Sequence, residues 1–166
     1  MLEDLLKSGL RLVICGTAAG SKSARTGQYY AGRGNCFWKV LHDIGLTGDA
    51  ILQPAEYRLL LNHGVGLTDL AKGVAGNDHN VAIENYNADA LWAKMIKCRP
   101  AVLSFNGKRA ASIFLDRSTR QIEYGLQSEH IGQTAIWVLP STSAAARAHW
   151  SRDPWRELAD HILRQP

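Results

Sequence analysis

The sequence predicts an α/β fold, a three-layer α/β/α sandwich with a central, mainly parallel sheet of four to five strands. Short apolar runs that have the length of buried strands alternate along the chain with segments whose apolar residues recur at helical spacing. Each apolar run also leads into polar or Gly-rich residues. This arrangement is typical of parallel strands, whose carboxyl ends open into the loops that bind ligands.

The predicted elements follow one another in regular order. Strands are expected at residues 10–15, 64–68, 101–105 and 134–139. Helical patterns lie between them, at residues 37–44, 55–61, 88–98 and 107–115. In the helix at 88–98, one face should carry Leu91, Trp92, Met95 and Ile96. The last helix should begin with Asp153 as its cap and Pro154 in its first turn, because an apolar stripe continues from there to Leu163.

The composition suits a single domain spanning residues 1–166. A chain of 166 residues with 46% hydrophobic content can bury a substantial core. No apolar run approaches the ~20 residues of a membrane span, and the first nine residues carry Glu3, Asp4 and Lys7, unlike a signal peptide. We therefore expect a cytoplasmic protein that binds no membrane, associated with the nucleoid in a bacterium. We also expect a monomer.

The cysteines and histidines do not have the spacing of a metal site. Cys15, Cys36 and Cys98 are far apart and form no CxxC pair, which predicts reduced structural thiols. The six histidines show neither HxxxH nor His-Cys ligand spacing. We expect no metal and no cofactor.

Basic residues gather in the loops that follow the predicted strands. The formal net charge is +4 and the pI is near 9.1. The basic residues of these loops are Lys22, Arg25, Arg33, Lys39, Lys108, Arg109, Arg147 and Arg152. A face that contacts phosphates requires charge in such places. Ordinary solvated Lys and Arg residues explain the pattern equally well.

The stretch from Gly16 to Trp38 is interpreted as an active-site loop. It is rich in Gly, Ser and Tyr and has no hydrophobic periodicity for about 20 residues, and loops of that length in a compact domain are more often functional than idle. Gly16, Lys22 and Ser23 stand where a phosphate-binding GxxxxGK[ST] motif would place them, but Ser21 replaces the second glycine. This departure argues against nucleotide hydrolysis.

The segment LPSTSAAAR, residues 139–147, directly follows the fourth predicted strand. The small hydroxyl side chains of Ser141, Thr142 and Ser143 allow a phosphate to approach the backbone closely, and Arg147 adds charge. A capped helix start, with Ser141 or Ser143 as the cap, is the alternative of equal weight.

Three further side chains in the loops have two interpretations each. Tyr30 could form a platform for a flat base or pack over the edge of the sheet. Asn35 could cap the helix that follows it or hold a water molecule in a pocket. Asp69 could accept a hydrogen bond from the ring N–H of a nucleobase or cap another helix.

The loops, in this order, resemble the uracil-DNA glycosylase superfamily, closest to its mismatch-specific uracil and thymine-DNA glycosylase branch. The GINPG signature of that family appears as GTAAG at residues 16–20, and its GxGN.FWK stretch appears at residues 32–39. Further similar segments are GVGLTDL, FNGK, YGLQ and LPSTSA, at residues 64–70, 105–108, 124–127 and 139–144. Tyr29-Tyr30 and Thr68-Asp69 look more like the hypoxanthine-DNA glycosylase branch.

The resemblance implies a monofunctional glycosylase that flips a deaminated base out of DNA and hydrolyses the N-glycosidic bond, as in base excision repair. The expected substrate is uracil in DNA, with hypoxanthine and xanthine as further candidates. By resemblance, Tyr30 stacks on the flipped base and Asp69 reads its edge. The loop that contacts the substrate also includes Gly16, Thr17, Ala18 and Gly20. The DNA backbone would be held by Lys108, Ser141, Thr142, Ser143 and Arg147.

Two residues depart from the family pattern. Ala18 stands where relatives carry the Asn that activates the water, and a methyl group cannot hold a water molecule. Ala145 stands where relatives place a bulky wedge, which favours single-stranded or poorly paired substrates unless Arg147 substitutes. The water must then be positioned by another residue, for which Asn35 is our first candidate and Ser23 our second. A non-catalytic protein that binds damaged DNA is the alternative that Ala18 raises.

Overall fold

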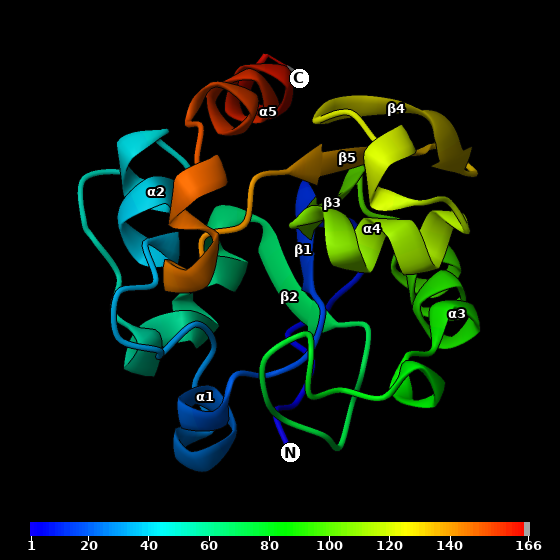
Figure 1. The fold of residues 1–166 in the computed structure, drawn as a ribbon. Helices are drawn as coiled ribbons and strands as arrows, with labels where there is room; N and C mark the ends of the chain where they lie inside the picture. Colours follow the sequence, from blue (N-terminus) through cyan, green and yellow to red (C-terminus); the bar gives the residue numbers. More distant parts are fainter. Residues whose placement is uncertain (165–166) are drawn as a thin grey trace.

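The central sheet joins five strands in the order β2-β1-β3-β5-β4 (Figure 1). We describe it from a computed structural model, which covers residues 1–164. The strands are β1 (Leu12–Gly16), β2 (Val65–Asp69), β3 (Val102–Asn106), β4 (Gly125–Ile131) and β5 (Thr134–Leu139). Every neighbouring pair is parallel except β4 and β5, which are antiparallel. The predicted α/β fold with a mainly parallel sheet is thus confirmed, and the four predicted strands correspond to β1, β2, β3 and β5.

Strand β4 is the strand whose position the sequence pattern did not predict. Its residues GLQSEHI alternate between buried and exposed positions, with Leu126 exposed and Ile131 buried. It lies at the edge of the sheet and packs only one face against the protein. A strand of this kind lacks the continuous apolar run by which the buried parallel strands are recognised.

The α-helices are α1 (Ser21–Thr26), α2 (Phe37–Asp43), α3 (Ala88–Cys98), α4 (Lys108–Leu115) and α5 (Asp153–Leu163). Short 3₁₀ helices are η1 (Pro54–His63), η2 (Ile83–Asn85), η3 (Thr119–Gln121) and η4 (Ala144–His149). The predicted helices at 37–44, 88–98 and 107–115 are present, and the one at 55–61 falls within η1.

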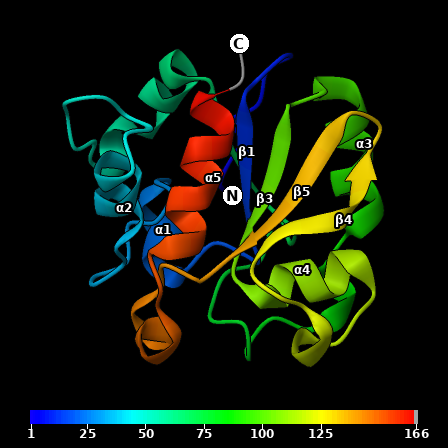
Figure 2. The ribbon, with the colours of Figure 1, turned by 90° about the horizontal axis from the view of Figure 1, so that it is seen from above.

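Helices cover both faces of the sheet (Figures 1 and 2). Leu12 and Ile14 of β1 point to the face where α2, η1 and α5 pack, with Phe37, Leu60 and Trp155 in the same core. The other face of β1 carries Val13 and Cys15 and is covered by α3 and α4. All five residues of β1 are buried, because a central parallel strand has no solvent-facing side.

Three local expectations were wrong in detail. The aperiodic stretch from Gly16 to Trp38 is not one continuous loop, because α1 forms within it and ends at Gly27, whose φ of 67° is left-handed. Arg152 occupies the N-cap position of α5, so Asp153 lies in the first turn, where its charge suits the helix dipole. In α3, Leu91, Met95 and Cys98 are buried, while Trp92 and Ile96 are 46% and 52% exposed.

None of the helices in the described residues is both long enough and apolar enough to cross a membrane. Cys15 and Cys98 are buried, Cys36 is half-buried, and all three are free thiols.

Candidate active site

The carboxyl ends of the parallel strands bring the predicted loops together. The register pairs Gly16 at the end of β1 with Asp69 at the end of β2, and Asn106 at the end of β3 with Leu139 at the end of β5. The segment after β2 is anchored to the end of β1, since Ala71 N–H donates to the carbonyl of Thr17 at 2.8 Å. The predicted substrate loop and Asp69 are therefore neighbours.

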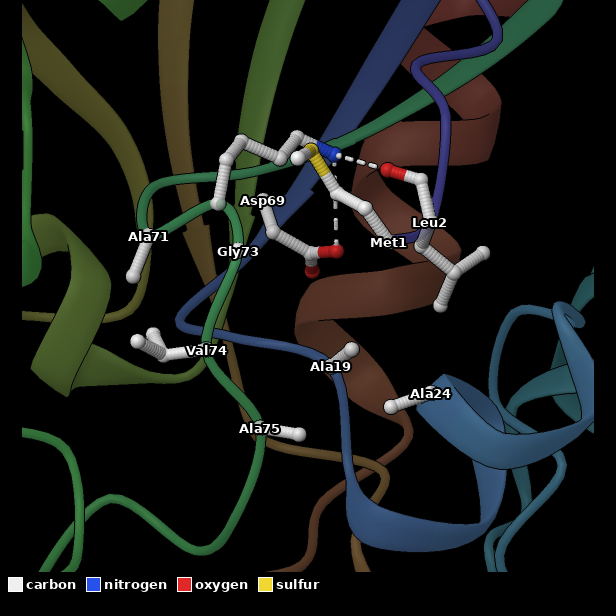
Figure 3. A pocket seen from close by; sticks show the side chains of 10 residues that line it. Met1, Leu2, Ala19, Ala24, Asp69, Ala71, Gly73, Val74 and Ala75 are labelled. Carbon is white, nitrogen blue, oxygen red and sulfur yellow. Dashed lines mark hydrogen bonds and ion pairs between the residues drawn. The ribbon is translucent and has the colours of Figure 1, made fainter.

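Asp69 lies beside a small cavity and is almost fully buried, with 4% of its surface exposed. Figure 3 shows its carboxyl group pointing into this space, between Ala19 of the first loop and Val74 of the loop after β2. The cavity has a volume of about 100 Å³. That is smaller than the roughly 300 Å³ at which drug-sized pockets begin, so only a small planar group would fit without movement of the loops.

Burial raises the pKa of Asp69 from 3.8 to about 6. The ammonium group of Lys72 opposes this effect, but its Nζ lies 3.7 Å from Asp69 Oδ2, beyond hydrogen-bond distance. No helix follows β2 directly, so Asp69 does not cap one. Its carboxyl group is available to a ligand in the cavity and changes its charge near neutral pH.

Gly16 makes this arrangement possible because it has no side chain. A Cβ atom at this position would lie 2.6 Å from Asp69 Oδ1 and 3.4 Å from the hydroxyl oxygen of Tyr30. The carboxyl group of Asp69 and the hydroxyl group of Tyr30 thus converge over the backbone of Gly16. The first glycine of the GTAAG segment is required by close packing.

We expect Gly16→Ala to lower any base-releasing activity by at least about tenfold, because a contact of 2.6 Å forces Asp69 out of position. Gly32→Ala is the matched control. Gly32 is exposed, has no left-handed φ, and has no atom within 4 Å of an added Cβ. Steady-state kinetics on both variants, with thermal melting to check folding, measures the effect. Equal rates for the two variants would contradict the expected effect of Gly16→Ala.

Tyr30 is held in a strained conformation at the centre of the site. Its φ of 53° is left-handed, which is uncommon for a bulky residue. Its ring stacks on Phe37, with centroids 3.8 Å apart and planes 22° apart. Its hydroxyl group is buried and has no hydrogen-bond partner among the described residues. Burial and then the charge of Asp69 raise the pKa of Tyr30, while the side chain of Asn106 acts in the opposite direction.

The two candidates for positioning the water have structural contacts of their own. Asn35 Oδ1 accepts a hydrogen bond from Phe37 N–H at 3.0 Å, so it serves the start of α2. Its amide NH₂ group is left for another partner. Ser23 is buried in α1, and its Oγ accepts a hydrogen bond from Ala31 N–H at 3.0 Å. This bond ties α1 to the segment after Tyr30.

A second network joins the ends of β3 and β5 to the loop that precedes α2. Asn106 Nδ2 donates to Thr142 Oγ1 at 2.9 Å, and Thr142 N–H donates to Asn106 Oδ1 at 3.0 Å. Cys36 N–H donates to the carbonyl of Thr142 at 3.0 Å. The hydroxyl group of Thr142 is therefore taken up inside the protein, whereas Ser141 and Ser143 are only half-buried. Ser141 Oγ accepts from Ser143 N–H, and neither serine caps a helix by a side-chain bond.

Two of the predicted DNA-binding residues, Arg147 and Lys108, contact neighbouring loops. Arg147 is exposed and its Nη2 donates to the carbonyl of Gly34 at 3.3 Å, so it links η4 to the Gly-rich loop. Lys108 Nζ lies 4.6 Å from the centroid of the Tyr124 ring. Thr17 and Ala18 are half-buried and Gly20 is exposed.

Three polar residues of the site were not predicted: Asp4, Lys72 and Asn106. Asn106 could have been predicted from the sequence. It is a polar residue at the end of an apolar strand, and that position faces the edge of the sheet where ligands bind. Lys72 follows Asp69 by three residues, and Asp4 comes from the N-terminal segment, 65 positions before it in the chain. No sequence pattern connects Asp4 with Lys72.

The comparisons with known proteins identify the family and the fold. A sequence model described as the uracil DNA glycosylase superfamily matches residues 3–160. The chain belongs to this superfamily. Its members are DNA glycosylases, so the family that the motifs predicted is confirmed, whereas its branch stays a prediction.

The fold is also that of a solved relative of the family. The solution NMR structure of a proposed uracil DNA glycosylase from Methanosarcina acetivorans is similar to this chain with a TM-score of 0.67 and 23% sequence identity. The similarity covers 98% of this chain and 96% of the other. At this level of identity the match supports the α/β architecture.

Proposed function

We propose that this protein is a monofunctional DNA glycosylase that removes uracil, and also hypoxanthine and xanthine, by hydrolysing the N-glycosidic bond in base excision repair. The observation that carries the proposal is the convergence of Asp69, Tyr30 and Gly16 beside a small cavity, in a chain of the uracil DNA glycosylase superfamily. We place the activity in one domain spanning residues 1–166. It acts as a cytoplasmic monomer, at the nucleoid in a bacterium, without metal or cofactor.

Recognition by Asp69 would separate uracil and hypoxanthine from their parent bases. Uracil and hypoxanthine carry a ring N–H next to a carbonyl group, where cytosine and adenine carry a bare ring nitrogen. Xanthine carries the same N–H, but so does its parent guanine, so Asp69 would accept xanthine without excluding guanine. The ionised carboxylate accepts a hydrogen bond from the N–H and repels the lone pair of the bare nitrogen. The base must first leave the stack, because its edge and the anomeric carbon are inaccessible in the duplex. Tyr30 would contact the face of the extruded base.

Catalysis would rest on positioning and electrostatics. The bond between the sugar C1′ and the base nitrogen breaks, and the base leaves as an anion stabilised by the amides of the first loop. Water then adds to C1′ and loses a proton to the solvent, from which the base anion regains one. Ala18 has no group that can hold this water. Asn35 is the first candidate, because its amide group has a free donor, and Ser23 is the second.

The DNA backbone would lie along the rim formed by Lys108, Ser141, Ser143 and Arg147, and the buried Thr142 would support this segment from inside through its bonds with Asn106. We expect Arg147→Ala to weaken DNA binding about three- to tenfold and to lower the slope of log affinity against log salt by about 1. Arg147→Lys should keep the slope because it keeps the charge. Lys97→Ala is the control, since Lys97 is exposed near the end of α3, which leads to the amino end of β3. Fluorescence anisotropy at several salt concentrations measures both quantities; equal slopes for Arg147→Ala and Lys97→Ala would remove Arg147 from the interface.

The function itself is tested with a labelled oligonucleotide that contains one uracil, followed by treatment with alkali. Strand scission at the uracil is expected, and it should be faster in single strands, because Ala145 offers no bulky wedge for the stack. The second candidate function is non-catalytic binding of damaged DNA, which Ala18 favours. A clear gel shift without scission for any deaminated base would support that candidate and overturn ours.

A further inference from the structure

The N-terminal segment brings a second carboxylate next to the cavity. Leu5 pairs with Leu67 of β2 through two backbone hydrogen bonds of 2.8 and 3.0 Å, which holds the segment against the sheet. Asp4 thereby meets cations from two different elements. Lys72 Nζ lies 2.6 Å from its Oδ1, and Lys94 Nζ from α3 lies 2.6 Å from its Oδ2. Thr68 donates a third hydrogen bond to Oδ1 at 2.7 Å.

Lys72 is shared unequally between the two carboxylates. Its ammonium group is 2.6 Å from Asp4 but 3.7 Å from Asp69. Two further acceptors, the hydroxyl oxygen of Tyr29 at 3.1 Å and the carbonyl of Leu2 at 3.3 Å, hold it on the side of the N-terminal segment. The dashed lines of Figure 3 mark two of these contacts, one ending on Leu2 and one on Asp69. Asp69 is left as a buried carboxyl group whose ion pair with Lys72 is long, beyond hydrogen-bond distance.

The charged and titratable groups that interact with Asp69 come from several elements. Among the described residues they include Lys72, Lys94, Asp4, Tyr29, Tyr30 and Cys15. Burial raises the pKa of Asp69 most, Lys72 opposes this, and the negative charge of Asp4 raises it further. Burial also acts to raise the pKa of Asp4, but the hydrogen bonds from Lys72, Lys94 and Thr68 outweigh it and the pKa of Asp4 is lowered. Asp4 is thus the carboxylate of the pair that stays ionised.

We propose that Asp4 is a positioning residue that determines base recognition, because it draws Lys72 away from Asp69 and so leaves Asp69 free to exchange a proton with the solvent and the substrate. The proposal rests on the proposed function. An ionised Asp69 accepts from a ring N–H, whereas a protonated Asp69 donates to a carbonyl oxygen or to a bare ring nitrogen. Asp4 would therefore set the pH at which the site changes from the first mode to the second.

The test compares three variants. Asp4→Asn keeps the size of the side chain but frees Lys72 to pair with Asp69. Lys94→Gln removes a cation that stabilises the ionised form of Asp69 and leaves Asp4 to Lys72 alone. Glu3→Gln is the matched control, since Glu3 is exposed and pairs only at 3.8 Å with Arg58, which is itself exposed.

We expect the inflection in the pH profile of uracil release to move down by about one unit or more in Asp4→Asn, because an opposite charge at contact distance favours the ionised carboxyl group. It should move up in Lys94→Gln and stay in place in Glu3→Gln. A purely structural role of Asp4 would lower the rate without moving the inflection. If Asp4→Asn does not fold, Asp4→Ser, which removes the same negative charge, is measured in its place.

The carboxyl ¹³C resonance of Asp69, assigned by its loss in Asp69→Asn, gives the same titration without any substrate. It therefore separates this proposal from the proposed function: an inactive wild-type protein would refute the glycosylase, while the resonance would still report the shifts. An unchanged titration of Asp69 in both Asp4→Asn and Lys94→Gln would overturn the role of Asp4.

Discussion

Asn35→Ala is expected to slow uracil release by a factor of about 100 or more while DNA affinity stays within about threefold. A group that positions the reacting water or stabilises the transition state contributes about this much, and it does so without holding the DNA. The chain offers few other candidates for this role, because the side chain of Ala18 is only a methyl group. Single-turnover kinetics on a uracil oligonucleotide, together with anisotropy for binding, measures the two effects separately.

A second variant separates chemistry from folding. Asn35 Oδ1 also accepts the N–H of Phe37 at the start of α2, so alanine removes a structural bond whose loss costs about 1 kcal/mol. Asn35→Ser keeps an oxygen for this N–H but removes the amide group. We expect Asn35→Ser to melt like the wild type and to be as slow as Asn35→Ala. Uracil release near the wild-type rate in Asn35→Ser would exclude the amide group of Asn35 from the mechanism. Ser23 would then be the remaining candidate for positioning the water.

Asp69→Asn is expected to make the protein more stable at pH 7.5 but not at pH 4. Raising the pKa of a carboxyl group from 3.8 to about 6 corresponds to roughly 3 kcal/mol. The folded protein binds this proton more tightly than the unfolded chain, so the wild-type protein loses that stability as the pH rises from about 4 to about 6. Asparagine has no charge to bury, so the variant does not lose this stability as the pH rises. Thermal melting of both proteins from pH 4 to pH 8 tests the prediction; a constant difference in melting temperature would contradict it.

The same substitution bears on recognition. Uracil release by the wild type should rise with pH through about 6, because the ionised carboxylate is the form that accepts a ring N–H. Asp69→Asn should lose this inflection and change the ratio of the rates on uracil and hypoxanthine, since an amide donates as well as accepts. An unchanged ratio would separate Asp69 from base recognition.

Local sequence patterns were sufficient for the buried framework. β1, β2, β3 and β5 are apolar on both faces, and α3 has an amphipathic pattern bounded by Asn87, whose side chain caps it. Strand β4 has neither a continuous apolar run nor a capping residue, because only alternate residues of it face the core. Helix α1 has six residues and no apolar stripe of its own. Elements without a pattern of their own, such as β4 and α1, form because their neighbours pack around them.

The position of Asp69 at a ligand edge could also be predicted, since it ends a buried strand, and the order of the loop motifs indicated the family. The environment of Asp69 could not be predicted from the sequence. Its burial depends on the Gly16–Asp69 register, and the length of its ion pair with Lys72 depends on the contacts of Asp4 with Lys72 and Lys94. The chain alone determined which chemical groups lie at the ends of its strands, because strand and loop patterns are local. The charge of those groups was decided only by the tertiary structure, because a pKa depends on solvent exclusion and on charges distant in the sequence.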